Sequence, residues 1–211
     1  MLILDHLTVI APTLSEGVAH VQECLGLAVP FGTRHHYMGT HNHRLQLGNN
    51  VYLEIVARDP DGIDPGRARW FGLDDLAQVR EDWKQGRRLR GWVAATRSIE
   101  RVVAQHPEFG DVVPLPFTEP AFAFAIPVDG SLPQDGVLPS LIDRRDNPTK
   151  MSEIPELGAR LVSITLQHPE PESVEATYRE LAVDQPPTVR FGPSLRYEAT
   201  IETPNGLRTL W

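Results

Sequence analysis

The chain contains little of what several common classes of protein depend on. Its 211 residues include one cysteine, Cys24, so no disulfide can form within the chain. Apolar neighbours at helical spacing predict that Cys24 is a buried thiol rather than a nucleophile. No apolar run approaches the length of a membrane-spanning helix, and the first residues lack the basic start and long apolar core of a signal peptide. We therefore expect a cytoplasmic protein without a membrane partner.

Basic residues are in the minority. There are 20 Lys and Arg residues against 28 Asp and Glu residues, which gives a formal net charge of −8. This balance argues against binding to a nucleic-acid backbone. The one short basic run, residues 84–90, has no aromatic residues between its charges, so we interpret it as a solvated loop or helix end. We expect no nucleic-acid partner.

Several catalytic and cofactor motifs are also missing. The chain has no HExxH or CxxC spacing, no Gly-rich phosphate loop, and no convincing Ser-His-Asp or Cys-His order. A hydrolase triad, a nucleotide-binding loop and a structural zinc site therefore have little support.

What is present is the composition of a soluble globular protein, with 41% hydrophobic and 23% charged residues. One order of elements, strand-helix-strand-strand-strand, occurs three times, which predicts an α+β fold of repeated βαβββ modules. The expected segments are a first module over residues 1–58, a connecting segment with a short helix over 59–90, a second module over 91–144, a linker over 145–159, and a third βαβββ-like module over 160–211. Two of the expected strands cover residues 27–31 and 137–144.

The most informative stretch covers residues 33–56, which hold four of the eight histidines. Polar and apolar residues alternate from His43 onward, as in a strand with one packed and one wet face. After a Gly-Asn-Asn turn, Glu54 is the one acid in an otherwise apolar strand over residues 51–56. A buried carboxylate needs a cation, a hydrogen-bond donor or a raised pKa, so Glu54 predicts a polar pocket on this sheet.

The same alternation predicts which residues could bind a ligand. If His41 faces one side of its strand, Asn42 and Arg44 share the other side, where an amide beside a guanidinium makes a clamp for a carboxylate or carbonyl. The alternative is that these side chains only support the loop. His35 and His36 precede a short flexible loop at residues 37–39 and are expected to be exposed. The alternative is that one of them reaches the cleft. The candidate substrate-binding residues are His36, His41, Asn42, Arg44, Tyr52 and Trp92.

Three segments resemble the glyoxalase-like branch of the vicinal oxygen chelate superfamily. They are Leu4-Asp5-His6, Gly39-Thr40-His41-Asn42 and Tyr52-Leu53-Glu54. The resemblance implies paired βαβββ modules that form curved mixed sheets around a cleft. In that superfamily the cleft commonly binds a divalent metal through ligands on the first and fourth strands of each module.

Carried over residue by residue, the resemblance places His6 and Glu54 at the ligand positions of the first module. In the second module Asp143 falls at the acidic position, while residues 91–94 offer no ligand. If the third module were the partner instead, Ser163 and Thr209 would fall at these positions. One imidazole and two carboxylates would suit Mn, Fe, Ni or Zn, with water completing the coordination. The alternatives are a structural histidine for His6 and an ion pair with a neighbouring arginine for Asp143.

Three functions follow as hypotheses. The first is a metal-dependent lyase or isomerase for a small substrate with vicinal oxygens, in which Glu54 or a nearby histidine moves a proton. The second is a metal-free protein that binds a small molecule through Trp92, Tyr52 and Arg44. The third is a purely structural or interaction module. Because an odd number of modules leaves one sheet uncovered, we also expect a homodimer.

Overall fold

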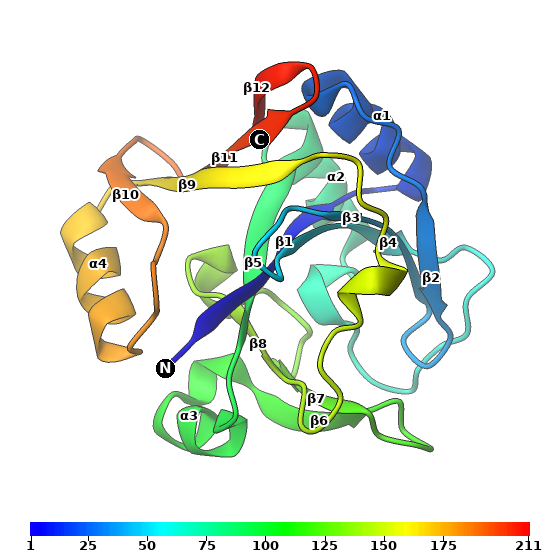
Figure 1. Cartoon of the computed structure of the whole chain (residues 1–211). Coiled ribbons are helices and arrows are strands. Elements are labelled where there is room, and N and C mark those ends of the chain that lie inside the picture. The colour runs from blue at the N-terminus through cyan, green and yellow to red at the C-terminus, as the bar shows by residue number, and fades with distance from the viewer.

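The computed structural model describes residues 1–211 and contains one large and one small β-sheet (Figure 1). The large sheet has eight strands in the order β2-β3-β4-β1-β5-β8-β7-β6. Its strands are β1 (Ile3–Ile10), β2 (Phe31–His35), β3 (Thr40–Gln46), β4 (Tyr52–Arg58), β5 (Leu89–Ala95), β6 (Asp111–Leu115), β7 (Phe122–Ile126) and β8 (Ser140–Asp143). The predicted α+β class with curved mixed sheets is confirmed.

The strand order is mirrored about the join between β1 and β5. On one side β1 runs parallel to β4, and on the other β5 runs parallel to β8, while β1 and β5 pair antiparallel. Helix α1 (Leu14–Leu25) connects β1 to β2, and α3 (Ile99–Gln105) connects β5 to β6. Thr13 caps α1 by accepting a hydrogen bond from the Glu16 amide at 3.3 Å. The two halves of the large sheet are thus two βαβββ modules joined side by side.

The rest of the chain forms a smaller sheet and short connections. The small sheet has the order β10-β9-β11-β12, and α4 (Pro171–Glu180) lies between its first two strands in the chain. Its strands are β9 (Arg160–His168), β10 (Thr188–Phe191), β11 (Arg196–Thr203) and β12 (Gly206–Leu210). The connections contain α2 (Leu76–Lys84) and four short 3-10 helices, η1 (Trp70–Gly72), η2 (Pro107–Phe109), η3 (Pro133–Gly136) and η4 (Met151–Glu153). No helix is both long and apolar enough to cross a membrane.

The two faces of the large sheet pack into two separate hydrophobic clusters, because side chains alternate along each strand. One face, called the inner face here, carries Ile10, Val56 and Val93 and packs against Trp70 and Phe71 of η1. The other, outer face packs against α1, α4 and the small sheet. Its cluster includes Leu7, Leu53, Trp92, Tyr178 and Tyr197.

The third module covers the outer face within the same chain. The Tyr178 hydroxyl donates to the Val137 carbonyl at 2.6 Å, and the Tyr197 hydroxyl donates to the Gly136 carbonyl at 2.8 Å. The Leu161 amide also donates to the Leu47 carbonyl at 2.9 Å, so the small sheet is tied to both halves of the large one.

Two strands begin later than the sequence pattern predicts. The strand expected over 137–144 is shortened to β8, because the preceding η3 turn extends to Val137, which has helical backbone angles with φ of −58° and ψ of −47°. The strand expected over 27–31 lies instead at β2, so part of the histidine-rich segment belongs to this edge strand.

Candidate functional site

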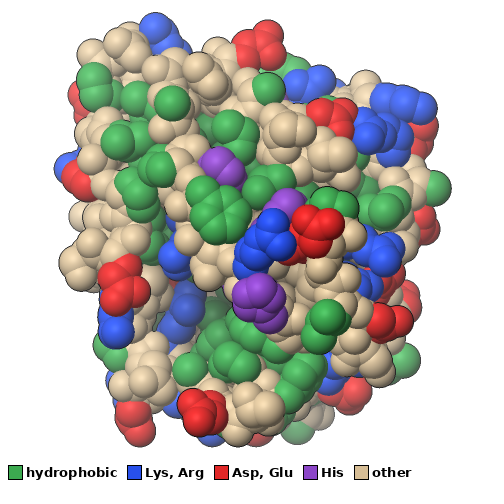
Figure 2. Space-filling view, turned by 90° about the vertical axis from the view of Figure 1, so that its right-hand side faces the viewer, with side chains coloured by type: hydrophobic (Ala, Val, Ile, Leu, Met, Phe, Trp, Pro, Cys, Tyr) green, Lys and Arg blue, Asp and Glu red, His purple; other side chains and the backbone are tan.

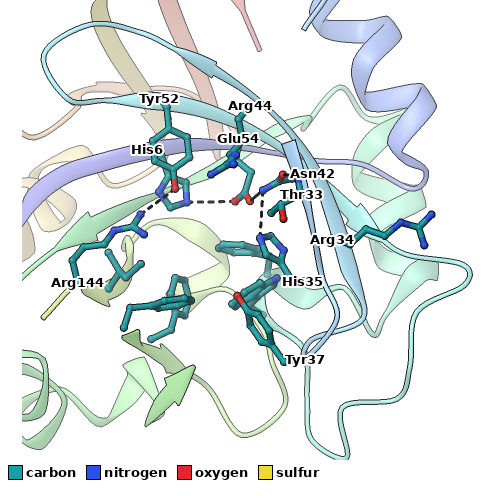
Figure 3. A pocket seen from close by; sticks show the side chains of 15 residues that line it. His6, Thr33, Arg34, His35, Tyr37, Asn42, Arg44, Tyr52, Glu54 and Arg144 are labelled. Atoms are coloured by element: carbon teal, nitrogen blue, oxygen red, sulfur yellow. Dashed lines mark hydrogen bonds and ion pairs between the residues drawn. The ribbon is translucent and has the colours of Figure 1, made fainter. Parts of the chain in front are cut away.

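A cavity of about 250 Å³ lies on the inner face, between the large sheet and η1 (Figure 3). Its polar lining comes from the first module, from β2, β3, β4 and β1, together with one arginine that follows β8. Its apolar lining comes from η1, β7 and β8. The lining side chains used below are His6, His35, Asn42, Arg44, Tyr52, Glu54, Trp70, Phe122, Phe124, Ile142 and Arg144.

A register shift in β1 brings two neighbouring side chains to the same side of the sheet. The pairing of β1 with β5 is irregular between Leu4 and His6, which breaks the strict alternation at Asp5. As a result the Asp5 carboxylate contacts the His6 ring, with Oδ1 2.7 Å from Nδ1. Both side chains are buried. Asp5 therefore fixes the orientation of the imidazole and directs its Nε2 atom toward the cavity.

His6 Nε2 faces the Glu54 carboxylate at 3.4 Å from Oε2. The other Glu54 oxygen accepts a hydrogen bond of 2.6 Å from the Asn42 amide nitrogen. Asn42 is held in turn by the Thr33 amide, which donates to its Oδ1 at 2.8 Å. These contacts place an imidazole and a carboxylate side by side at the cavity wall, as Figure 3 shows.

Arg144 closes the same network from the second module. Its Nη2 donates to Asp5 Oδ1 at 2.6 Å and its Nε donates to Asp5 Oδ2 at 3.1 Å, so the two side chains form a bidentate ion pair. Nη2 also donates to the Tyr52 hydroxyl at 3.1 Å, and the Tyr52 ring stacks on His6 with 4.5 Å between ring centroids. The site therefore depends on the contact between the two modules.

The pKa shifts follow from burial and from these contacts. Burial alone would lower the pKa of His6, but the hydrogen bonds and charges of Asp5 and Glu54 outweigh it and raise that pKa above 6.5. Burial would raise the pKa of Glu54, yet His6 and Asn42 lower it from 4.5 to about 2. At neutral pH the two groups form an imidazolium–carboxylate pair.

His35 differs from His6 because burial, which no acidic hydrogen-bond partner offsets, lowers its pKa from 6.5 to about 4. Its Nδ1 lies 3.0 Å from the Thr40 hydroxyl oxygen, and its Nε2 lies 3.5 Å from the Asn42 amide nitrogen. His35 is therefore neutral near pH 7 and supports Asn42.

The structure brings together most of the residues predicted from the first module. His6, Asn42, Arg44, Tyr52 and Glu54 all line the cavity. His36 is exposed, and His41 lies near Asp59, with 3.9 Å between its Nδ1 and the carboxylate. Trp92 points to the outer face and packs edge-on against Tyr178.

Asp143 also lies outside this cavity. It lines a separate one, and its Oδ1 accepts a hydrogen bond of 2.8 Å from the Arg145 amide. Ser163 and Thr209 belong to the third module, on the far side of the sheet. Thus neither predicted partner of His6 and Glu54 reaches them.

The donor set does not fit the divalent-metal centre that the resemblance implies. Of the three predicted ligands, only His6 and Glu54 lie next to each other. No group of three or more His, Cys, Asp or Glu side chains is placed to hold a metal ion. At the cavity the second module supplies Ile142 and Phe124, which cannot bind a metal, and the cation of Arg144.

Several lining residues have no clear signal in the sequence. Trp70 and Phe71 lie in the connecting segment, where no periodic pattern marks them as part of a site. Arg144 follows Asp143 directly in the sequence, which predicts an ion pair between these two rather than a place in the cavity. The one available clue to Asp5 was its place next to His6, but regular alternation predicts opposite directions for the two.

The inner-face cavity and the mirrored modules define a protein of the vicinal oxygen chelate superfamily. A family model described as a glyoxalase-like domain matches residues 4–182, so the chain belongs to this glyoxalase-like family. The resemblance stated from the sequence is therefore confirmed. No curated protein matches the chain.

A solved structure shows a similar fold over most of the chain. A hypothetical protein from Staphylococcus aureus is similar over 96% of this chain and 92% of its own, with a TM-score of 0.58 and 13% identity. A Streptomyces coelicolor methylmalonyl-CoA epimerase variant, in complex with 2-nitronate-propionyl-CoA, is similar over 66% of this chain and 92% of its own, with a TM-score of 0.38 and 16% identity. At 13% identity, the likeness to the Staphylococcus aureus protein concerns the fold alone.

Proposed function

We propose that this protein is an isomerase or lyase that moves a proton on a small carbonyl compound bound in the inner-face cavity. The observation that carries the proposal is the contact between His6 and Glu54 at the cavity wall, 3.4 Å apart. An acid and a base placed this close can act on two adjacent atoms of one substrate.

In the proposed reaction Glu54 is the general base and His6 is the general acid. Glu54 takes a proton from the carbon next to the substrate carbonyl, and the electron pair of that C–H bond forms the new C=C bond. His6 Nε2 gives its proton to the carbonyl oxygen, so that an enol rather than a free enolate forms. In an isomerisation of an α-hydroxy carbonyl compound, Glu54 returns the proton to the former carbonyl carbon, and the hydroxyl on the adjacent carbon gives its proton to His6 as a new C=O bond forms there. In an elimination, the enol hydroxyl gives its proton back to His6 as the carbonyl re-forms, and a leaving group departs with its bonding electrons from the carbon on the other side of the deprotonated carbon.

Burial makes Glu54 a stronger base once a substrate is present. In the free protein His6 holds the pKa of Glu54 at about 2, against the opposing effect of burial. A substrate oxygen that takes the His6 Nε2 hydrogen bond removes the contact that lowers this pKa, while the burial remains. The Glu54 pKa then rises toward the range that suits proton abstraction.

The test is exchange of carbon-bound protons with solvent. Phenylpyruvate has protons at C3 next to its ketone, and their replacement in D₂O can be followed by proton NMR. We expect the protein to accelerate this exchange, and we expect Glu54→Gln and His6→Gln each to slow it by about 100-fold or more. The chain should be used with and without prior chelator treatment, because the donor set predicts no dependence on metal.

Asp143→Asn is the matched control, since it also removes a buried carboxylate but lies outside the cavity. It should retain the wild-type exchange rate. Exchange that survives Glu54→Gln, or that stops with chelator and returns with Mn, Ni or Zn, would contradict the proposed mechanism.

The second candidate is a protein that binds a small molecule without changing it. The observation in its favour is that His6 and Glu54 hold each other in their charged forms, in which neither is a strong base. This candidate predicts saturable binding of a small molecule in the cavity, with no proton exchange above the uncatalysed rate.

A further inference from the structure

The cavity contains one cation that no acid neutralises. Arg144 is paired with Asp5, and Arg34 at the rim is paired with Asp59 at 3.1 Å. His6 lies between two carboxylates. The Arg44 side chain, in contrast, makes no hydrogen bond or ion pair, and its Nε is buried without a partner. A guanidinium held in a partly buried site without an acceptor is the group that an anionic ligand would complete.

Arg44 also stands where a ligand could reach the proposed catalytic pair. It lies directly opposite Glu54 in the pairing of β3 with β4, so the two side chains share the inner face. Figure 3 shows both directed into the same cavity. An anion bound to Arg44 would therefore place its neighbouring atoms beside His6 and Glu54.

The opposite wall of the cavity is aromatic. The ring of Trp70 lies 5.4 Å from that of Phe124 and 5.8 Å from that of Phe71, measured between centroids. Phe122 and Ile142 extend this apolar wall. The buried indole nitrogen of Trp70 has no acceptor in the protein. Such a wall suits the face or edge of a ligand ring.

The size of the cavity limits the ligand. Its volume of about 250 Å³ lies below the roughly 300–1,000 Å³ of sites for drug-sized ligands. An enclosed coenzyme or nucleotide would not fit, whereas a single ring with a short acid chain would.

We propose that the cavity selects small carboxylates with an aryl group, and that Arg44 binds the carboxylate while the Trp70 wall binds the ring. This inference rests on the proposal that the cavity binds the substrate, and it names the class of that substrate. It makes Arg44 the residue that determines specificity for the anion.

Calorimetric titration with three unreactive compounds tests the inference. They are 3-phenylpropanoate, its neutral amide 3-phenylpropanamide, and propanoate, which lacks the ring. We expect the wild-type protein to bind 3-phenylpropanoate at least about tenfold more tightly than either of the others, since a charged hydrogen-bonded pair and a buried ring each contribute that much. Arg44→Gln should remove the preference for the acid over the amide, and Arg44→Lys should restore part of it.

Arg80→Gln is the matched control, because Arg80 pairs with Glu16 far from the cavity. It should leave all three affinities unchanged. Equal binding of acid and amide, a preference that survives Arg44→Gln, or no binding of the acid at about 1 mM would each overturn the inference. Because the titration needs no catalysis, its failure is distinct from a failure of proton exchange with phenylpyruvate.

Discussion

At the scale of single residues, the site depends on Asp5, which holds both His6 and Arg144. A buried carboxylate between two cationic groups has its pKa lowered well below its ordinary value, in spite of burial. Asp5 thus stays ionised well below the pH at which an ordinary aspartate is protonated, and it fixes both the charge and the orientation of the imidazole.

Replacing Asp5 by Asn should lower the pKa of His6, because the hydrogen bond and charge of Asp5 help to raise it. It should also destabilise the fold by about 3 kcal/mol, since Arg144 loses its buried partner. The His6 pKa can be measured by NMR of the imidazole nitrogens. Asp61→Asn, at an exposed carboxylate, should change neither quantity. An unaltered His6 pKa in Asp5→Asn would show that Asp5 is not the controlling contact.

Glu54 predicts how stability depends on acid pH. Its pKa is lowered on folding from 4.5 to about 2, so its contribution to the free energy of unfolding is complete above pH 4.5 and is lost as the pH falls toward 2. The contribution is about 3 kcal/mol for a shift of this size. The contribution of His6 to stability depends on pH in the opposite direction. Its raised pKa stabilises the fold at low pH, and this contribution is lost as the pH rises through the folded-state pKa.

The measurement is urea unfolding, followed by tryptophan fluorescence, over a series of pH values. Glu54→Gln should be less stable than the wild type at pH 7 and should lose less stability between pH 4.5 and 2. Two parallel stability curves over that interval would contradict the assignment.

At the scale of elements, the cavity depends on the close approach of β2 and β3. A Cβ atom added at Gly32 would lie 2.4 Å from Asn42 Oδ1 and 2.9 Å from Arg44 Nε. The bare backbone of Gly32 in this edge strand is what allows both side chains to lie against it.

Gly32→Ala should therefore displace Asn42 and Arg44, weaken binding of 3-phenylpropanoate by more than about tenfold, and reduce stability by about 1–3 kcal/mol. Gly91→Ala on β5 is a matched control, because its added methyl would meet nothing nearer than Leu132 Cδ2 at 3.8 Å. Unchanged ligand binding by Gly32→Ala would show that the two side chains have room to move.

A second contact between elements holds the end of the chain. The guanidinium of Arg88 lies between the rings of Trp83 and Trp211, at 4.9 and 4.7 Å from their centroids, and contacts His20 Nδ1 at 2.9 Å. Arg88→Met should lower stability by about 1–2 kcal/mol, measured by thermal unfolding, without affecting ligand binding in the cavity. An unchanged melting temperature would indicate that this stacking contributes little.

The elements also show what the sequence could predict. His6, Asn42, Arg44 and Glu54 line one cavity. The shared side of Asn42 and Arg44 can be read from the sequence because strand alternation is a local property, whereas the place of His6 beside Glu54 is implied by the family resemblance. The sequence predicts Trp92 as a substrate-binding residue, but in β5 it is Val93 that faces inward, and Trp92 packs on the outer face. The register shift at Asp5 depends on the pairing of β1 with β5, two strands distant in the chain, so no local pattern reveals it.

At the scale of the whole molecule, the third module packs against its own chain, so an uncovered sheet face is no longer the reason to expect a homodimer. Its apolar face was expected to need a partner, yet Leu166, Tyr197 and Ile201 are buried against the same chain. What remain uncovered are the sheet edges, where Phe31 on β2 and Phe191 on β10 are exposed.

The homodimer is still a testable prediction, and we now expect the two chains to meet at one of these exposed sheet edges. Light scattering at micromolar concentration should give twice the chain mass of 23.6 kDa, and Phe191→Glu should reduce it if β10 forms the contact. On the face that Figure 2 shows, acidic and basic side chains are interspersed. The mass of a single chain for the wild type would contradict the prediction.

The mirrored order of strands about the β1–β5 join has a consequence for stereochemistry. The two halves of the cavity are related by this arrangement, but the first carries the imidazole, the carboxylate and Arg44, and the second carries apolar groups and a paired arginine. We therefore expect a ligand with one polar end to bind in a single orientation and to present only one face of a planar carbon to Glu54. Any new stereocentre formed there should have one configuration, so that the product is a single enantiomer.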